Sequence, residues 1–406
     1  MKNDPTSRPP CIVLGLETQI GLNIVRELGR AEVKVIGIGL SPASIGLSSR
    51  YLHEAVVVST PRSDELLAAI RAIGARWGAC PLIAVSESNL LWLGEHKEEL
   101  GSVTPVLPNP ESLRIVLDKA ATLRAAQAVG INVPLSWQPM SVDDIERQAQ
   151  DFPLPAVLKW SDPNAVVSKL EVLGLHLIKA EYVNTLAELN LALARYKSLG
   201  AWPLVQQYCP GHGIGQFFFM KEGRVVRRFQ HVRIAEWPPE GGFSSVCDAV
   251  SETEHLEIQS LSAQLLQDIG WSGVAMVEYR YDPATRKAFL MEVNGRFWGS
   301  FPLAYYCGAG FALCAYLDQL GEELPHLTTP RADLRCRMVA TEVKRLFRII
   351  FQRNKITDRA FEVRPWSEVW RFFADFVRSN VRYYVWASDD PMPWFADMRN
   401  LIRRKS

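Results

Sequence analysis

The chain has 406 residues, of which 48% are hydrophobic and 22% charged, and its net charge is +1. This length predicts two to four packing units, and the balanced charge gives no general reason to expect nucleic acid as a partner. No apolar run approaches the roughly 20 residues that a membrane-spanning helix needs, so we expect a soluble, cytoplasmic protein. The seven cysteines are scattered without a Cys-x-x-Cys pair, which indicates reduced thiols and no disulfide or zinc framework.

Strand and helix signals alternate through the first 110 residues. The apolar runs CIVLGLE, VKVIGIGL, EAVVVST and PLIAVSE predict buried strands, and TQIGLNIVRELGRA and DELLAAIRAIGARWG have the apolar spacing of helices. This alternation predicts a doubly wound α/β domain over residues 1–110. Gly15 and Gly21 flank the first turn, but the Gly-x-Gly-x-x-Gly spacing is absent, so the sequence does not predict nicotinamide binding.

Two lysines lie where they could contact phosphate. A long predicted helix carries Lys119 and ends near Gly130, and Pro134 prevents its continuation. The predicted strand at 154–160 leads to Lys159, and the polar stretch SDPNAVVSK after it is expected to be a flexible loop. A compact ammonium beside such a loop suits a phosphate, although Lys159 alone is equally well interpreted as a surface lysine.

Polar side chains follow two later strands, GVAMVEYRYD at 273–282 and the beginning of FLMEVNGRFWGS at 289–300. Side chains alternate between the faces of a strand, so Glu292, Asn294 and Arg296 should share one face. If the two strands form a hairpin, Glu278 lies near Glu292. Two carboxylates and an amide oxygen are ligands that suit Mg²⁺, whereas a polar strand end before an Asn-Gly turn is the alternative interpretation.

The order of these features resembles the ATP-grasp superfamily, especially its carboxylate–amine ligases, over about residues 1–325 and most specifically at 273–300. The resemblance implies an α/β fold in which the N-terminal domain, 1–110, precedes a two-subdomain ATP-grasp fold. The small subdomain would span 111–205, and the large subdomain with the metal site 206–325. A basic, aromatic-rich, helical C-terminal extension would follow at 326–406. The implied cofactors are ATP and Mg²⁺, with Mn²⁺ as a substitute ion.

The resemblance also implies a role for each matching residue. It implies phosphate contacts at Lys119 and Lys159, an adenine-lining segment at Gln206, Gln207, Tyr208 and Cys209, Mg²⁺ ligands at Glu278, Glu292 and Asn294, and Arg296 near the transferred phosphoryl group. The chain departs from the family pattern at Gln207 and Gly213, where glutamates are usual, and at Gly295, where proline is usual. The glycine-rich flap that covers the phosphates would lie within 161–178.

The implied chemistry needs no side-chain nucleophile, and the sequence has no Gly-x-Ser-x-Gly elbow. ATP would convert a carboxylate to an acyl phosphate, and Arg296 would stabilise that intermediate and the oxyanion formed when an amine attacks. We therefore expect an ADP-forming ligase that joins a small-molecule carboxylate to an amine such as an amino acid. The alternatives are a phosphoryl or acyl-thiol transferase of the same fold and a nucleotide-binding sensor without turnover.

Substrate recognition is expected in residues 227–250. Arg228, His231 and Arg233 precede the glycine-rich stretch WPPEGGFSS, whose backbone N–H groups could approach an anion. The prediction is a carboxylate-binding loop in which Arg233, with Ser244 or Ser245, contacts the acid. The alternative is a solvated strand and loop, with His231 as a packing residue.

The C-terminal residues 331–406 hold 17 Lys and Arg against 9 Asp and Glu, a net charge of +8. Aromatic residues and arginines recur at helical spacing in EVWRFFADFVRSNVRYYVW. The first interpretation is a helical appendage that packs on the ligase body or on a homodimer mate. The alternatives are contact with an anionic membrane surface or a carrier protein, and no nucleic-acid-binding motif is present.

Overall fold

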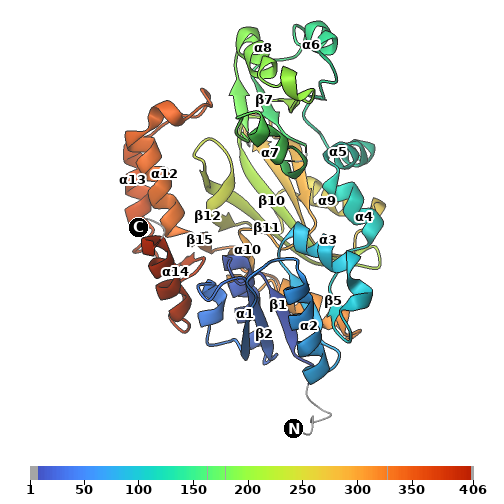
Figure 1. Cartoon of the computed structure of the whole chain (residues 1–406). Coiled ribbons are helices and arrows are strands. Elements are labelled where there is room, and N and C mark those ends of the chain that lie inside the picture. Colours follow the sequence, from blue (N-terminus) through green and yellow to red (C-terminus); the bar gives the residue numbers. More distant parts are fainter. Residues whose placement is uncertain (1–7, 162, 179, 327, 404–406) are drawn as a thin grey trace.

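The computed structural model describes residues 8–161, 163–178, 180–326 and 328–403. Figure 1 shows the N-terminal α/β domain at the bottom, the small subdomain at the top, and a large sheet between them. Two of the C-terminal helices, α12 (Val339–Phe351) and α13 (Pro365–Ala374), lie along one side of this sheet, and the last helix, α14 (Met392–Arg403), lies beside the N-terminal domain. The mixed α/β class and the helical C-terminal region are as the sequence predicts.

The N-terminal domain is a parallel five-stranded sheet in the order β3-β2-β1-β4-β5. Its elements are β1 (Cys11–Leu14), α1 (Gln19–Arg30), β2 (Val35–Gly39), β3 (Glu54–Val57), α2 (Asp64–Trp77), β4 (Pro81–Ala84), α3 (Glu87–Glu95) and β5 (Thr104–Pro105). Thr18 caps α1 by accepting a hydrogen bond from the Gly21 N–H. Strands β1, β2 and β4 are fully buried, which explains their continuous apolar runs.

The segment that carries Lys119 forms two helices, α4 (Pro110–Leu117) and α5 (Lys119–Ala128), so the prediction of one long helix is wrong. Asp118 breaks the helix because its backbone is extended and its carboxylate accepts hydrogen bonds from the N–H groups of Ala120 and Ala121. Lys119 is consequently the first residue of α5.

The small subdomain has a four-stranded antiparallel sheet in the order β6-β9-β7-β8. Its elements are β6 (Ser136–Trp137), α6 (Val142–Gln148), β7 (Ala156–Lys159), α7 (Pro163–Val172), β8 (Glu181–Val183), α8 (Leu186–Ala194) and β9 (Leu204–Gln207). Helix α7 replaces most of the loop predicted after Lys159, because Leu170 is buried in the subdomain core and Val166 packs against it. Residue 162 of that predicted loop lies outside the described residues.

The large sheet has seven strands in the order β14-β13-β10-β11-β12-β15-β16, antiparallel except for the last pair. Its strands and the helices between them are β10 (His212–Lys221), β11 (Arg224–Trp237), β12 (Phe243–Ala249), α9 (Leu256–Asp268), β13 (Gly273–Asp282), β14 (Lys287–Asn294), α10 (Phe301–Tyr306), α11 (Phe311–Gln319), β15 (Arg335–Arg337) and β16 (Val381–Tyr383). The hairpin of β13 and β14 forms where the sequence predicts it.

The C-terminal region contains strands as well as the predicted helices. Strands β15 and β16 extend the large sheet, and the helices are α12 (Val339–Phe351), α13 (Pro365–Ala374) and α14 (Met392–Arg403). A buried ion pair of 2.9 Å joins Asp390, just before α14, to Arg26 of α1. All seven cysteines lie in the described ranges and are free and buried. No helix within those ranges is long and apolar enough to cross a membrane.

Candidate active site

The hairpin of β13 and β14 brings the two predicted carboxylates together. Glu278 and Glu292 lie directly opposite each other in the strand register, and the register shifts immediately after Glu278. The Asn294 amide donates to Glu292 Oε1 at 2.9 Å, and Arg296 Nη2 donates to Asn294 Oδ1 at 3.0 Å. The predicted acid, amide and guanidinium therefore form one connected row.

The two predicted phosphate lysines face this row. Burial lowers the pKa of Lys159, and the nearby Lys119 lowers it further, while Glu292 and Glu278 act in the opposite direction. Burial by itself would raise the pKa of Glu292, but Lys119, the Asn294 amide, Arg233 and Lys159 hold it below its usual range. The two lysines and the two carboxylates therefore lie close enough to shift one another's pKa values.

Arg233 reaches the same carboxylates by crossing a neighbouring strand. It extends from β11 over β10, and its Nη2 pairs with Glu278 Oε2 at 2.5 Å. Its Nη1 pairs with Glu236 at 3.0 Å and donates to the Gly242 carbonyl at 2.8 Å. Burial raises the pKa of the Glu278 carboxyl, and the repulsion from Glu292 adds to it, while Arg233 lowers it.

Gly213 makes this crossing possible. A Cβ atom at residue 213 would lie 2.5 Å from Cδ of Arg233, closer than such atoms can approach. Residue 213 is therefore covered by an arginine side chain, which explains why this chain needs glycine there.

The predicted adenine-lining segment follows β9. Gln206 accepts a hydrogen bond from Lys159 Nζ at 3.3 Å and donates to Ser136 Oγ at 3.2 Å. The Tyr208 hydroxyl donates to Asp358 Oδ2 at 3.0 Å, so the C-terminal region contacts this segment. Gln207 is half-buried at the end of β9, and Cys209 is buried. Burial raises the pKa of the Cys209 thiol to about 11.

The remaining predicted substrate residues differ in where they lie, and His231 is across Gly215 from Glu278 in the strand register. Arg228 is exposed, pairs with Glu252 at 3.5 Å, and by strand alternation faces away from Arg233. His231 is buried with its ring at 4.8 Å from that of Phe217, and burial, with Arg233 nearby, lowers its pKa well below the usual range. Ser244 and Ser245 are buried, and the Ser244 hydroxyl donates to the Val246 carbonyl. His231 is therefore neutral and packs in the core.

The arrangement has a limited set of metal ligands. In the part of the chain that the structure describes, no group of three or more His, Cys, Asp and Glu residues could hold a metal ion. The opposed Glu278 and Glu292, with the Asn294 amide, could supply a partial set of oxygen ligands. Mg²⁺ accepts such a set because it completes its coordination with waters and phosphate oxygens.

Comparison with known proteins identifies the architecture. No family model and no curated protein matches the chain. Among solved structures, a biotin carboxylase–β,γ-ATP complex from Campylobacter jejuni has a TM-score of 0.62 at 14% identity and covers 81% of this chain and 74% of its own. N5-carboxyaminoimidazole synthetase from Staphylococcus aureus with ADP has a TM-score of 0.58 at 12% identity and covers 79% and 80%. The chain has the ATP-grasp fold.

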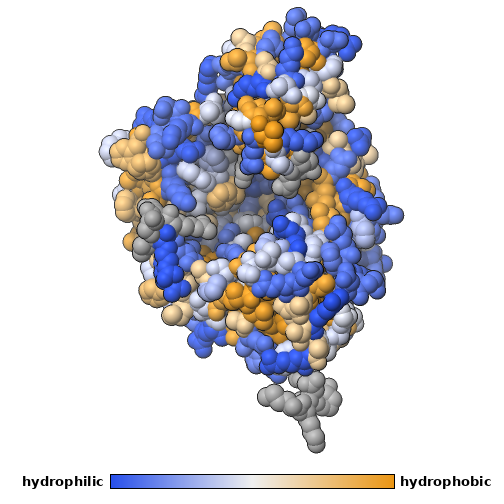
Figure 2. All heavy atoms as spheres, in the orientation of Figure 1, coloured by the Kyte–Doolittle hydropathy of each residue, from blue (hydrophilic) through white to orange (hydrophobic). Residues whose placement is uncertain are grey.

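The biotin carboxylase domain of Hydrogenobacter thermophilus 2-oxoglutarate carboxylase is a third ATP-grasp structure of this kind. It was solved as a dimer with MgADP, ADP and bicarbonate, and it has a TM-score of 0.61 at 16% identity, covering 81% of this chain and 74% of its own. In the present ATP-grasp chain, Figure 2 shows the surface hollowed between the small subdomain at the top and the N-terminal domain below.

Several charged residues of the site lie outside the motifs found in the sequence. Glu236 pairs with both Arg233 and Arg280, and Glu87 at the start of α3 pairs with Arg296 at 3.2 Å. Strict strand alternation would place Glu236, three residues after Arg233, on the opposite face, and the irregular register between them allows the two side chains to pair. The sequence carries no signal for Glu87, because its domain reaches the site only in the folded protein.

Proposed function

We propose that the chain is an ATP- and Mg²⁺-dependent ligase that activates a carboxylate as an acyl phosphate and joins it to an amine, with release of ADP and phosphate. The observation that carries this proposal is the pairing of Glu278 with Glu292 beside Asn294, Lys119 and Lys159. The nucleotide complexes of the similar ATP-grasp structures support it.

The lysines and the carboxylates have complementary tasks in this proposal. Lys119 and Lys159 would contact phosphate oxygens of ATP, and Glu278, Glu292 and Asn294 would hold Mg²⁺, or Mn²⁺ in its place. A bound ion would neutralise charge on the β- and γ-phosphates. Glu292 suits this task because its pKa is held low, so it is ionised at neutral pH. The segment from Gln206 to Cys209 would line the adenine.

The reaction would proceed in two displacements. A carboxylate oxygen of the substrate attacks the γ-phosphorus of ATP, and the bond to ADP breaks. The amine nitrogen then attacks the acyl carbon, loses a proton, and expels inorganic phosphate. Arg296 hydrogen-bonds Asn294 in the row of Glu292 and Asn294, and its guanidinium would stabilise the acyl phosphate and the oxyanion.

The contacts of Arg233 favour a different task from the one that the sequence predicts. Because its guanidinium already contacts Glu278, Glu236 and the Gly242 carbonyl, we propose that it orients the metal-binding carboxylate. Contact with the substrate carboxylate would require it to leave one of these partners.

The decisive experiment is a screen of acid and amine pairs for ADP release. The proposed ligase should release ADP and phosphate in equal amounts, and positional isotope exchange in ATP should need only the carboxylate. Formation of AMP would contradict an acyl phosphate. A phosphorylated product or a thioester would identify the transferase alternative, and tight ATP binding without turnover would favour the sensor.

A further inference from the structure

Helix α12 buries charged side chains and exposes apolar ones, the opposite of an ordinary surface helix. Its side toward the large sheet carries Glu342 and Arg345, which are buried. Its side toward solvent carries large apolar side chains at Val343, Phe347, Ile350 and Phe351, of which Phe351 is 71% exposed. A helix that only covers a core in water places these two classes of residue the other way round.

Helix α13, which lies beside α12, also exposes large apolar side chains to solvent. Trp366, Trp370, Phe373 and Val377 recur at helical spacing through α13 and its C-terminal end, and all four are exposed. Trp366 and Trp370 are 85% and 76% exposed, respectively. No residue of α13 is fully buried. The two helices contact each other, so their outer faces form one apolar surface.

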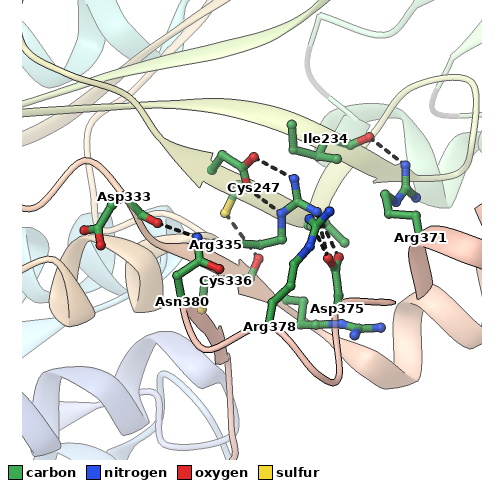
Figure 3. Close-up of polar contacts among 12 residues, drawn as sticks. Ile234, Cys247, Asp333, Arg335, Cys336, Arg371, Asp375, Arg378 and Asn380 are labelled. Carbon is green, nitrogen blue, oxygen red and sulfur yellow. Dashed lines mark hydrogen bonds and ion pairs between the residues drawn. The ribbon is translucent and has the colours of Figure 1, made fainter. Parts of the chain in front are cut away.

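Ion pairs attach these helices to the body. Arg335 of β15 pairs with Asp248 of β12 and with Asp375 at the end of α13. Figure 3 shows Asp375 between Arg335 and Arg378, with which it also pairs. Asp375 is fully buried, and the distances from Arg335 to its two partners are 2.6 and 2.9 Å. The charged side chains that would normally face water are thus used for attachment.

The same attachment removes negative charge from the outer surface. Among the acidic residues of 339–378, Glu342, Asp358 and Asp375 are buried and Glu368 is half-buried in a pair with Arg345, so only Glu362 is exposed. The exposed cations of the same segment are Lys344, Arg353, Lys355, Arg359, Arg364 and Arg378. The apolar surface is therefore bordered by net positive charge.

We propose that α12 and α13 form a docking surface for an anionic lipid bilayer. Exposed tryptophan and phenylalanine side chains would enter the interfacial region, and the surrounding lysines and arginines would contact lipid phosphates. A second copy of the chain fits less well, because a symmetric contact would bring two positively charged surfaces together. This inference does not depend on the proposed ligase activity.

The test is sedimentation of the full chain with phospholipid vesicles. The wild type should bind vesicles of phosphatidylcholine mixed with phosphatidylglycerol more strongly than vesicles of phosphatidylcholine alone, and salt should weaken the binding. The variant with Trp366→Ser, Trp370→Ser and Phe373→Ser should lose binding by at least roughly tenfold. Its melting temperature should be unchanged, since the three side chains are exposed.

A matched control carries Met140→Ser, Val172→Ser and Leu191→Ser, which replace exposed apolar residues of the small subdomain. This control should bind vesicles as the wild type does. A second variant, Lys344→Glu with Lys355→Glu, should lose its preference for the anionic vesicles.

Three outcomes would overturn the proposal. They are no vesicle binding by the wild type, equal loss of binding in the control, and a wild-type dimer that the tryptophan variant converts to a monomer without any vesicle binding. The last result, measured by light scattering, would show that a second copy covers the surface.

Discussion

Arg233 on β11 crosses β10 to pair with Glu278 on β13. The strand between them carries Gly213 and Gly215, and added Cβ atoms there would meet Arg233 and His231, respectively. A carboxylate predicted to bind metal is therefore held by a residue two strands away, and Gly213 leaves the space for that contact.

Replacing Gly213 by alanine should lower the turnover of ATP. The new Cβ would lie 2.5 Å from Cδ of Arg233, so the guanidinium must leave Glu278 or Glu236. We expect kcat to fall at least roughly tenfold, because a displaced carboxylate no longer holds the ion in the productive geometry.

Gly94→Ala is the matched control for this substitution. Gly94 lies in α3, and an added Cβ there would meet only Leu107, at 4.0 Å. Alanine in a helix should leave activity unchanged and slightly raise stability. Equal activity of Gly213→Ala and wild type would show that the contact between Arg233 and Glu278 is not needed.

Glu292→Gln should abolish Mg²⁺-dependent ATP cleavage while the fold persists. The substitution creates no cavity but gives up the favourable contacts that hold the pKa of Glu292 below its usual range, so the melting temperature should be unchanged or modestly lower. We expect a loss of at least roughly a hundredfold in kcat. Glu257→Gln, at an exposed residue of α9, is the control. Cleavage by Glu292→Gln at near wild-type rate would disprove the metal assignment.

Local patterns in the sequence predicted the N-terminal βαβ pattern and the β13–β14 hairpin. Both predictions depend on the spacing of apolar residues within single segments, with a period of two residues for strands and 3.6 for helices. Packing against neighbouring elements did not change these secondary structures. The alternation of Glu292, Asn294 and Arg296 predicted their connected row for the same reason. The roles of these residues in binding ATP and metal remain predictions.

Two kinds of feature could not be predicted from the sequence: a helix break set by a competing side chain, and contacts between segments far apart in the chain. The break between α4 and α5 depends on the competition of the Asp118 carboxylate for backbone N–H groups. Strands β15 and β16 have three residues each, and they form because β12 offers an edge to β15, which in turn pairs with β16. The two ion-pair partners of Arg233 are 3 and 45 residues away along the chain, and strict alternation would place the nearer one, Glu236, on the opposite face.

Tyr208→Phe should weaken ATP binding with little effect on kcat. The Tyr208 hydroxyl donates to Asp358, which is buried, so the C-terminal region braces the predicted adenine segment. Without this bond the segment is less ordered, and we expect the Michaelis constant for ATP to rise roughly three- to tenfold. Tyr196→Phe is the control, because Tyr196 packs on Trp160 in the same subdomain. An unchanged constant would show that the brace does not affect the nucleotide.

The pair of Glu342 and Arg337 should make stability depend on pH. Both side chains are buried, their nearest charged atoms are 2.5 Å apart, and burial raises the pKa of Glu342 to about 7 although Arg337 opposes the rise. An unfolded glutamate titrates near pH 4.3. Between about pH 4.3 and pH 7 the folded chain therefore binds a proton at Glu342 that the unfolded chain has released, and this contribution to stability declines as the pH rises through that window.

Glu342→Gln should remove this contribution. Urea unfolding of the wild type and the variant across about pH 5 to pH 8 should show that the wild type loses up to roughly 3 kcal/mol more of its free energy of unfolding as the pH rises. The comparison isolates Glu342 from Glu27, whose pKa burial also raises to about 7 and which both proteins retain. Glu323→Gln, at an exposed residue, controls for the loss of a carboxylate and should follow the wild type. Parallel curves for the wild type and Glu342→Gln would mean that Glu342 stays ionised in the folded chain throughout this range, because the attraction of Arg337 then outweighs the effect of burial.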